Sequence, residues 1–409
     1  MISRILAMRV VRLLIGLLLF AGFATAVYLL AKPPAAVFVI SKGGTYHGTW
    51  NSDDAAAPVI LVKTKDPVII ENSTLRGRGN LIVCNTRHAD ITIRNTRGLG
   101  MNPNIAGKAA GRFASIERFD RVVIENCEME GTAGIYLLDY AGKGTAKQSV
   151  RIVGNRSKNI DGRKSDGNDG YLNSAELVQF VQFDKVRHLA GVEIAWNEVV
   201  NEPGNSAVED NISIYLSSGT PDSPIRIHDN FLRGAYPLHP QTDQYSGGGI
   251  MLGDGVGQVT SEDPSFVQAY DNVVLDTTNY GIAISAGHDN SFYRNRILSA
   301  GVLPDGRKIA AQNVGAYIWD SYKAGKDHFF NNSGSENVIG WAKGNERNDW
   351  WTPNATSWEK NVNWPGVGVV IGGPIPIKAY EAEEKLWRDR VKRAGVSVGL
   401  TNPTTAPSR

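Results

Sequence analysis

Four short apolar segments in the middle of the chain each run into a side chain that can exchange a proton. These side chains are Asp184, Asp254, His288 and Asp320. If the segments are parallel neighbours in one sheet, their ends align and the four groups share one face, within a residue or two of register. Asp184 and Asp254 would then lie two strands apart, roughly 10 Å, near the carboxyl separation of an inverting glycosidase. We therefore predict that the four residues are catalytic.

A second set of polar side chains lies on two segments in which apolar and polar residues alternate. Arg226 and His228 belong to one segment and Glu193 to the segment before it, and alternation predicts that all three point outward. We predict a substrate-binding role for this set. For any one aspartate the alternative is a turn residue that bonds its own backbone. Asp254 is flanked by glycines, and both roles remain open there.

The elements that must position these residues repeat along the chain, and an Asn marks each repeat. The marks are Asn72, Asn95, Asn126, Asn155, Asn197, Asn230, Asn272, Asn295 and Asn332. They are 23 to 42 residues apart, as expected for a coil of constant length with insertions. Asn tolerates left-handed backbone, and its amide can bond the Asn of the next coil. The pattern predicts an all-β parallel solenoid; the alternative is a β-sandwich, whose strands recur about every 8–12 residues without a shared Asn.

These repeats, and successive strand segments such as Gly247–Gly255 and Gly281–Asp289, resemble the right-handed parallel β-helix family typified by pectate lyases. The resemblance covers about Val37 to Gly373. Lyases of this fold class use Lys, Arg, His or Tyr to remove the proton α to a uronate carboxylate, which calcium or Arg neutralises. The resemblance therefore implies a polysaccharide ligand, lyase or glycoside hydrolase chemistry, and calcium as the candidate cofactor. The alternative is a non-catalytic protein that binds glycan or supports an envelope or exopolysaccharide system.

Four insertions are expected to wall a groove beside the predicted catalytic face. They are residues 156–176, 201–210, 234–246 and 255–265, and each follows an Asn-marked strand. Long loops that leave one corner of a rigid scaffold are common places for binding sites. The alternative is that these loops have no role in binding or catalysis.

The N-terminal segment is apolar and follows three arginines. Residues 13–31 form a 19-residue apolar run without charge, long enough to cross a bilayer as a signal anchor. Ala24, Thr25 and Ala26 also fit a signal-peptide cleavage site, which would release a secreted protein. The apolar run continues beyond that site, so we favour an anchor in the inner membrane. Both alternatives place the body in the periplasm or outside the cell.

Composition excludes several other classes of function. The chain has a formal net charge of +2, and its first 32 residues contribute +4, which leaves a body at −2 without a polybasic surface for nucleic acid. The sequence contains neither a phosphate-binding P-loop nor a zinc-binding motif. Cys84 and Cys127 lie at different points of neighbouring repeats, so we expect two buried free thiols.

The C-terminal part differs in composition from the repeats. Trp341, Trp350, Trp351, Trp358 and Trp364 fall within 24 residues. They can stack on sugar rings or close the open end of a solenoid, and we favour a cap because they follow the last regular repeat. Residues 366–371 are a candidate final strand, and 377–393 a helix that packs on the cap or on the side of the solenoid. The predicted parts are thus 1–36, a β-helix over 37–373, and a C-terminal helix and tail over 374–409.

Overall fold

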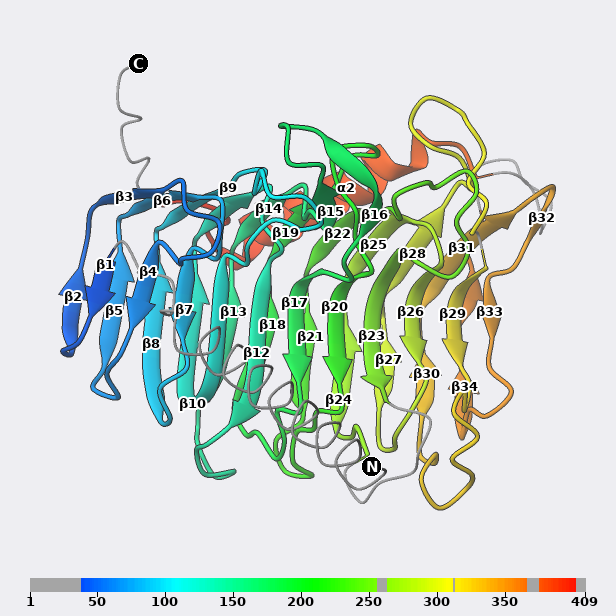
Figure 1. The fold of residues 1–409 in the computed structure, drawn as a ribbon. Coiled ribbons are helices and arrows are strands. Elements are labelled where there is room, and N and C mark those ends of the chain that lie inside the picture. The colour runs from blue at the N-terminus through cyan, green and yellow to red at the C-terminus, as the bar shows by residue number, and fades with distance from the viewer. Residues whose placement is uncertain (1–37, 256–262, 312, 366–374, 402–409) are drawn as a thin grey trace, which may run out of the picture. The chain divides into compact units, whose positions relative to one another are not determined.

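The computed structural model describes residues 38–255, 263–311, 313–365 and 375–401. Within these residues the chain is almost entirely β-strand and passes in turn through three stacks of parallel strands, with each strand paired to its counterpart in the next pass (Figure 1). We call one pass a coil. Long stacks of parallel strands fit the predicted parallel β-helix, and the all-β class is confirmed.

The three stacks divide the strands as follows. Stack 1 contains β1 (Phe38–Ile40), β4 (Ile60–Val62), β7 (Ile82–Cys84), the first part of β10 (Ala114–Glu125), β12 (Ile135–Tyr140), β17 (Gln179–Asp184), β20 (Asp210–Tyr215), β23 (Gly248–Asp254), β26 (Tyr280–Ile284), β29 (Val314–Ile318) and β33 (Trp350–Trp351). Stack 2 contains β2 (Gly44–Tyr46), β5 (Val68–Glu71), β8 (Ala89–Arg94), the second part of β10, β13 (Val150–Val153), β18 (Val192–Ala195), β21 (Ile225–His228), β24 (Val267–Tyr270), β27 (Ser291–Tyr293), β30 (Ser333–Ser335) and β34 (Ser357–Glu359). Stack 3 contains β3 (Thr49–Ser52), β6 (Thr74–Gly77), β9 (Arg97–Gly100), β11 (Glu128–Glu130), β14 (Arg156–Lys158), β19 (Glu198–Val200), β22 (Phe231–Ala235), β25 (Val273–Thr277), β28 (Arg296–Ser299), β31 (Val338–Lys343) and β35 (Val362–Asn363).

Alternation along each strand fills the space between the stacks with apolar side chains. One inward row of stack 1 runs through Ile60, Ile82, Ala114, Ile135, Val181, Ile212, Ile250, Ile282 and Ala316, which pair in register from coil to coil. These side chains are fully buried and belong to one continuous core. Burial of this row in every coil stabilises the fold, because a single coil cannot cover its own apolar face.

The predicted Asn repeat exists, but its register was wrong in part. Buried amides at the corner between stacks 2 and 3 bond one another at 2.7–3.0 Å and form a ladder of Asn155, Asn197, Asn230, Asn272, Asn295, Asn337 and Asn361. Asn72, Asn95 and Asn126 lie one residue earlier, with φ of 46–52°. Asn suits that left-handed position as well as the ladder position, and this explains the error.

Asn332 belongs to a different corner, between stacks 1 and 2, where its Oδ1 accepts the backbone N–H of Asn290 at 3.2 Å. The predicted loops also divide between corners. Residues 201–210 and 234–246 connect stack 3 to stack 1, as does the hairpin β15 (Arg163–Ser165) and β16 (Tyr171–Ala175). Residues 255–265 leave the corner between stacks 1 and 2, and 256–262 lie outside the described residues. The prediction of one common corner for the four loops was therefore wrong.

Three of the five C-terminal tryptophans close the core, which fits the predicted cap, whereas Trp351 is exposed and Trp364 packs in the apolar cluster beneath the C-terminal helix. Trp341 is fully buried in the core, and Trp350 and Trp358 pack against it from the end. The helix α2 (Ala379–Ala394) packs on the outer face of stack 3, where Trp387 contacts Phe231 with ring centroids 5.4 Å apart. Residues 366–371, predicted as a final strand, lie outside the described residues.

Cys84 and Cys127 are buried and free, as predicted.

The apolar run 13–31 lies outside the described residues. Among the helices that the structure describes, none combines the length and the apolar character needed to cross a membrane.

Candidate active site on the outer face of stack 1

Two predicted aspartates lie in one outward row on stack 1, with a tyrosine between them. Asp184 of β17 pairs in register with Tyr215 of β20, and Tyr215 pairs with Asp254 of β23. The register between β20 and β23 shifts just before this point, so an extra residue brings Asp254 to Tyr215. The structure therefore places the two residues two coils apart, on strands separated by roughly 10 Å. We call these three residues the acidic column.

Each aspartate of the column accepts a hydrogen bond from a tyrosine of a different coil. Tyr136 of β12 donates its hydroxyl to Asp184 Oδ2 at 2.7 Å. Tyr322, which follows β29, donates to Asp254 Oδ1 at 2.6 Å. Burial and the hydrogen bond to the neighbouring carboxylate raise the pKa of both tyrosines far above the usual range. Both hydroxyls therefore stay neutral and act as donors that hold the carboxylates in place.

Asp254 has the protonation behaviour of a candidate acid. Burial raises its pKa, although the hydrogen bonds from Tyr322 and from the backbone N–H of Gly255 partly oppose the rise. Tyr215 also has a raised pKa, first because of burial and then because of the negative charges of Asp184 and Asp254. A raised pKa favours the protonated form of a carboxyl group, which is the form that a general acid needs.

Two further carboxyl groups lie beside the column and were missed by the sequence reasoning. Asp210 is buried at the start of β20 and bonds the Tyr280 hydroxyl, and Glu209 accepts the Ser246 hydroxyl at 2.8 Å. Burial raises the pKa of both carboxyl groups, and the negative charge of Asp254 adds to the rise. The adjacent pair Glu209–Asp210, directly before an apolar strand, was the signal in the sequence.

In the described strand pairings, neither of the other two predicted catalytic residues pairs in register with the column. His288 lies in the turn after β26, where its ring stacks on Phe330 at 4.5 Å and its Nδ1 lies 2.6 Å from Asp289 Oδ2. Asp320 lies in the turn after β29 and accepts the backbone N–H groups of Ala324 and Gly325, both at 2.8 Å. Both positions are those of turn residues with satisfied side chains.

The predicted substrate-binding set lies on stack 2. Glu193 pairs in register with Arg226, and its Oε1 lies 3.2 Å from His228 Nε2. Burial alone would lower the pKa of His228, but its hydrogen bonds to Asp229 and Glu193 outweigh burial and raise it. The His228 ring also stacks on Tyr270 at 4.8 Å. These groups face one another in an ion-pair and stacking network on a different surface from the column.

Strand β17 carries two polar atoms without a hydrogen-bond partner among the described residues. They are Gln179 Oε1 at its start and Asp184 Oδ1 at its end. The nearest cation to Asp184 Oδ1 is the Lys185 ammonium, at 3.5 Å. A buried acceptor without a partner costs about 1–3 kcal/mol, which a ligand that brings donor groups would recover. Hydroxyl groups of a sugar are such donors.

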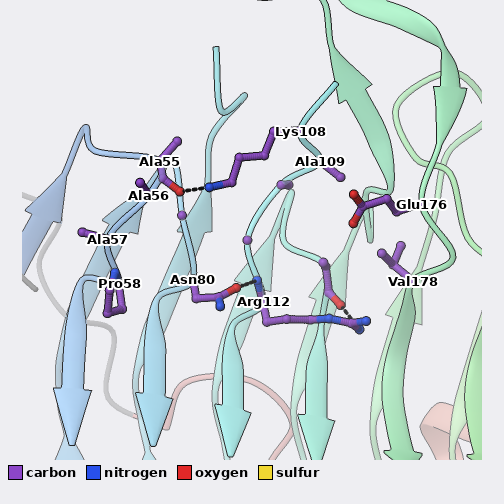
Figure 2. A pocket seen from close by; sticks show the side chains of 14 residues that line it. Ala55, Ala56, Ala57, Pro58, Asn80, Lys108, Ala109, Arg112, Glu176 and Val178 are labelled. Carbon is purple, nitrogen blue, oxygen red and sulfur yellow. Dashed lines mark hydrogen bonds between the residues drawn. The ribbon is translucent and has the colours of Figure 1, made fainter. Parts of the chain in front are cut away.

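A pocket of about 260 Å³ lies at the corner between stacks 3 and 1, where the stack 1 strands begin, whereas the column lies where they end (Figure 2). Small residues form much of its lining, and Lys108, Arg112 and Glu176 supply its charges. Arg112 donates to Ala133 O at 2.6 Å and to Gln182 Oε1 at 3.2 Å, and its guanidinium lies over the Tyr136 ring at 5.2 Å. Burial lowers the pKa of Arg112 to about 10, so it remains a cation at neutral pH. Tyr136 thus contacts both Arg112 of this pocket, through its ring, and Asp184, through its hydroxyl.

A second cavity, of about 490 Å³, lies at the same corner and shares Glu176 with the first. The β15–β16 hairpin and residues 237–246 wall it, and Glu209 belongs to its lining. Leu177 and Leu238 give it apolar surface next to these polar groups. An apolar wall with a few polar side chains is typical of a site for a small organic ligand or for one unit of a polymer.

An exposed aromatic pair lies at the C-terminal end of the same face. Trp351 of β33 pairs in register with Tyr317 of β29, and its ring lies 4.9 Å from that of Trp319. Trp319 and Trp351 are 39% and 46% exposed, unlike the tryptophans of the cap. Large apolar rings left in water on a face with polar pockets indicate a contact surface for a ligand.

The described residues contain no group of three or more His, Cys, Asp or Glu side chains placed to hold a metal ion. The column itself is a poor fit for calcium, because tyrosine donors already occupy one oxygen of each carboxylate.

No known family model matches this chain, and no curated protein or solved structure does either.

Proposed function

We propose that this chain is an exported, carbohydrate-active β-helix protein that hydrolyses a polysaccharide lying along the outer face of stack 1. We further propose that it is right-handed and belongs to the pectate-lyase-like superfamily. The observation that carries the activity is the acidic column, in which Asp184 and Asp254 face outward two coils apart and each is held by a tyrosine. Pockets at one corner and an aromatic pair on the same face support a long ligand.

The column favours hydrolysis over β-elimination. A lyase needs a base that removes a carbon-bound proton, and the tyrosines here have pKa values far too high to ionise near neutral pH. A hydrolase needs one carboxylic acid and one carboxylate. In the proposal Asp254 donates a proton to the glycosidic oxygen and Asp184 takes a proton from the attacking water. A strand separation of roughly 10 Å, slightly above the carboxyl separation of inverting enzymes, leaves room for that water and favours inversion at the anomeric carbon.

The test is product formation over a panel of bacterial and plant polysaccharides. New reducing ends without absorbance from unsaturated uronates are expected, and Asp184→Asn or Asp254→Asn should each abolish them. Asp222→Asn, which changes an exposed carboxylate in the turn between β20 and β21, is the matched control and should retain full activity. Unsaturated products would show a lyase. Binding without any product would favour the rival function, a non-catalytic glycan-binding surface protein.

The proposed location is the periplasm or the cell exterior, with residues 13–31 as the inner-membrane anchor. Its support is the sequence of that segment. Fractionation of cells that express the full chain tests it: an anchored protein stays in the membrane fraction after a high-salt wash. Recovery of a shortened protein in the soluble periplasmic fraction would show signal cleavage instead.

A further inference from the structure

A basic hollow of about 370 Å³ lies at the corner between stacks 1 and 2, beside the acidic column. Its basic lining residues are Arg87, Arg118, Lys185, Arg187 and His188, and they come from three coils. Asp139 is the one acidic residue in the lining. This balance of charge makes the hollow a candidate site for anionic groups.

The arginines of the hollow differ from those on the outer face of stack 2. There, Arg94, Arg121, Arg151 and Arg294 each lie 2.6–3.2 Å from a carboxylate. In the hollow, Arg118 donates to a backbone carbonyl, that of Asn85 at 2.7 Å, and neither it nor Arg87 has an ion pair among the described residues. Two guanidinium groups therefore lack a neutralising partner within this part of the chain.

The backbone of the turns directs these side chains away from the core. Arg118, Lys185 and His188 have φ of 54–56°, and each precedes a buried apolar residue. The left-handed turn lets the apolar neighbour enter the core while the basic residue stays exposed. The coils are stacked at roughly 4.8 Å, so these exposed residues follow one another along the edge of stack 1, with Asp139 of the intervening coil between Arg118 and Lys185.

The hollow is continuous with the column, because Lys185 directly follows Asp184 and its Nζ lies 3.5 Å from Asp184 Oδ1. We infer that the hollow binds anionic substituents of the polysaccharide, carboxylate or sulfate, that project sideways from a chain lying on stack 1. This inference rests on the proposed polysaccharide ligand and adds its chemical class, a polyanion. Guanidinium groups suit such oxyanions because their paired N–H groups match two oxygens at once.

The experiment compares three polymers with one backbone: dextran, carboxymethyl dextran and dextran sulfate. The full chain should bind at least one charged polymer and bind neutral dextran at least about tenfold more weakly; the charged polymer that binds identifies the oxyanion. The double variant Arg87→Gln/Arg118→Gln should weaken this binding about tenfold or more and reduce its dependence on salt, since two charge contacts are lost. The matched control, Arg94→Gln/Arg294→Gln, removes the same charge from stack 2 and should change affinity less than about twofold.

Equal losses in the two double variants would show non-specific attraction and overturn the inference, as would failure of the full chain to bind either charged polymer. The outcome is separable from that for the proposed hydrolysis. Loss of binding in Arg87→Gln/Arg118→Gln, with unchanged product formation in Asp254→Asn, would leave the anion site standing and reject the catalytic column. Unchanged binding in Arg87→Gln/Arg118→Gln, together with loss of product formation in Asp254→Asn, would reject the anion site alone.

Discussion

The hydroxyl of Tyr322 lies 2.6 Å from Asp254 Oδ1, although 68 residues separate the two in the chain. This bond lowers the pKa of a carboxyl group that burial raises. In Tyr322→Phe the pKa of Asp254 should therefore rise further. If Asp254 donates the proton, the alkaline limb of the pH profile of kcat/KM should move to higher pH, because the carboxyl group keeps its proton up to a higher pH.

The same variant separates catalysis from structure. Loss of one half-buried hydrogen bond should cost about 1 kcal/mol of stability, a small change in Tm. A lower Tm with an unmoved pH profile would show that Tyr322 only supports the fold. Tyr293→Phe on stack 2 is the matched control and should leave the profile in place.

Stability should depend on pH through Asp276, a fully buried carboxyl group that bonds Tyr236 at 2.7 Å and Tyr380 of α2 at 3.3 Å. Burial raises its pKa from 3.8 to about 7. Between these two pH values the folded chain holds a proton on Asp276 that the unfolded chain has lost. The contribution of this group to stability is therefore fully present below about pH 4 and is lost as the pH rises through 7. The loss is on the order of 4 kcal/mol at most.

Asp276→Asn should remove this pH dependence, and Asn also tolerates the left-handed backbone at this position, where φ is 57°. The measurement is Tm at pH 5 and pH 8 for the full chain, the variant and the exposed control Asp222→Asn. An unchanged difference between the two pH values in Asp276→Asn would contradict the assignment.

Removal of one amide from the middle of the Asn ladder should be costly. Asn230 Nδ2 donates to Asn272 Oδ1 and to Ile194 O, both at 2.9 Å, and its Oδ1 accepts from Asn197. Asn230→Ala leaves these buried groups without partners, so we expect a loss of roughly 2–4 kcal/mol, measured by urea unfolding. Asn72→Gly, at an exposed left-handed position, should cost less than about 1 kcal/mol. Equal losses would show that the ladder contributes little.

The exposed aromatic pair should contribute to binding and little to stability. Trp319→Ala/Trp351→Ala should weaken binding of the hydrolysed polysaccharide about tenfold, since each ring stacked on an apolar sugar face is worth roughly 0.5–1.5 kcal/mol. Leu386→Ala removes an exposed apolar side chain from α2 and serves as the control in the same titration. Unchanged affinity would place the ligand elsewhere on the face.

Much of the fold could be predicted because the coil imposes a local pattern that every pass repeats. Alternating Ile and Val, and a corner residue with a fixed role, are visible in sequence without knowledge of distant contacts. The ladder was misplaced by one residue at Asn72, Asn95 and Asn126 because Asn fits two adjacent positions of the same corner for different reasons. Sequence pattern does not distinguish a buried amide ladder from a left-handed turn.

The candidate site was only partly predictable. Alignment of strand ends brought Asp184 and Asp254 together, because register within a sheet follows from the pattern of apolar residues. The tyrosine partners come from different coils, and Tyr322 lies in a turn whose course depends on packing between coils. His288 and Asp320 were assigned to the same face because a strand's last residues cannot be told from the first residues of a turn by composition.

Each group of the acidic column belongs to its own coil, and this limits how the distances between them can vary. A gain or loss of one complete coil would move Asp254 relative to Asp184 by a fixed step of roughly 4.8 Å and leave the register inside each coil unchanged. A single substitution changes the chemistry at one position, but it hardly changes where that position lies along the face. A relative with a longer or shorter ligand repeat would therefore be expected to differ from this chain by whole coils.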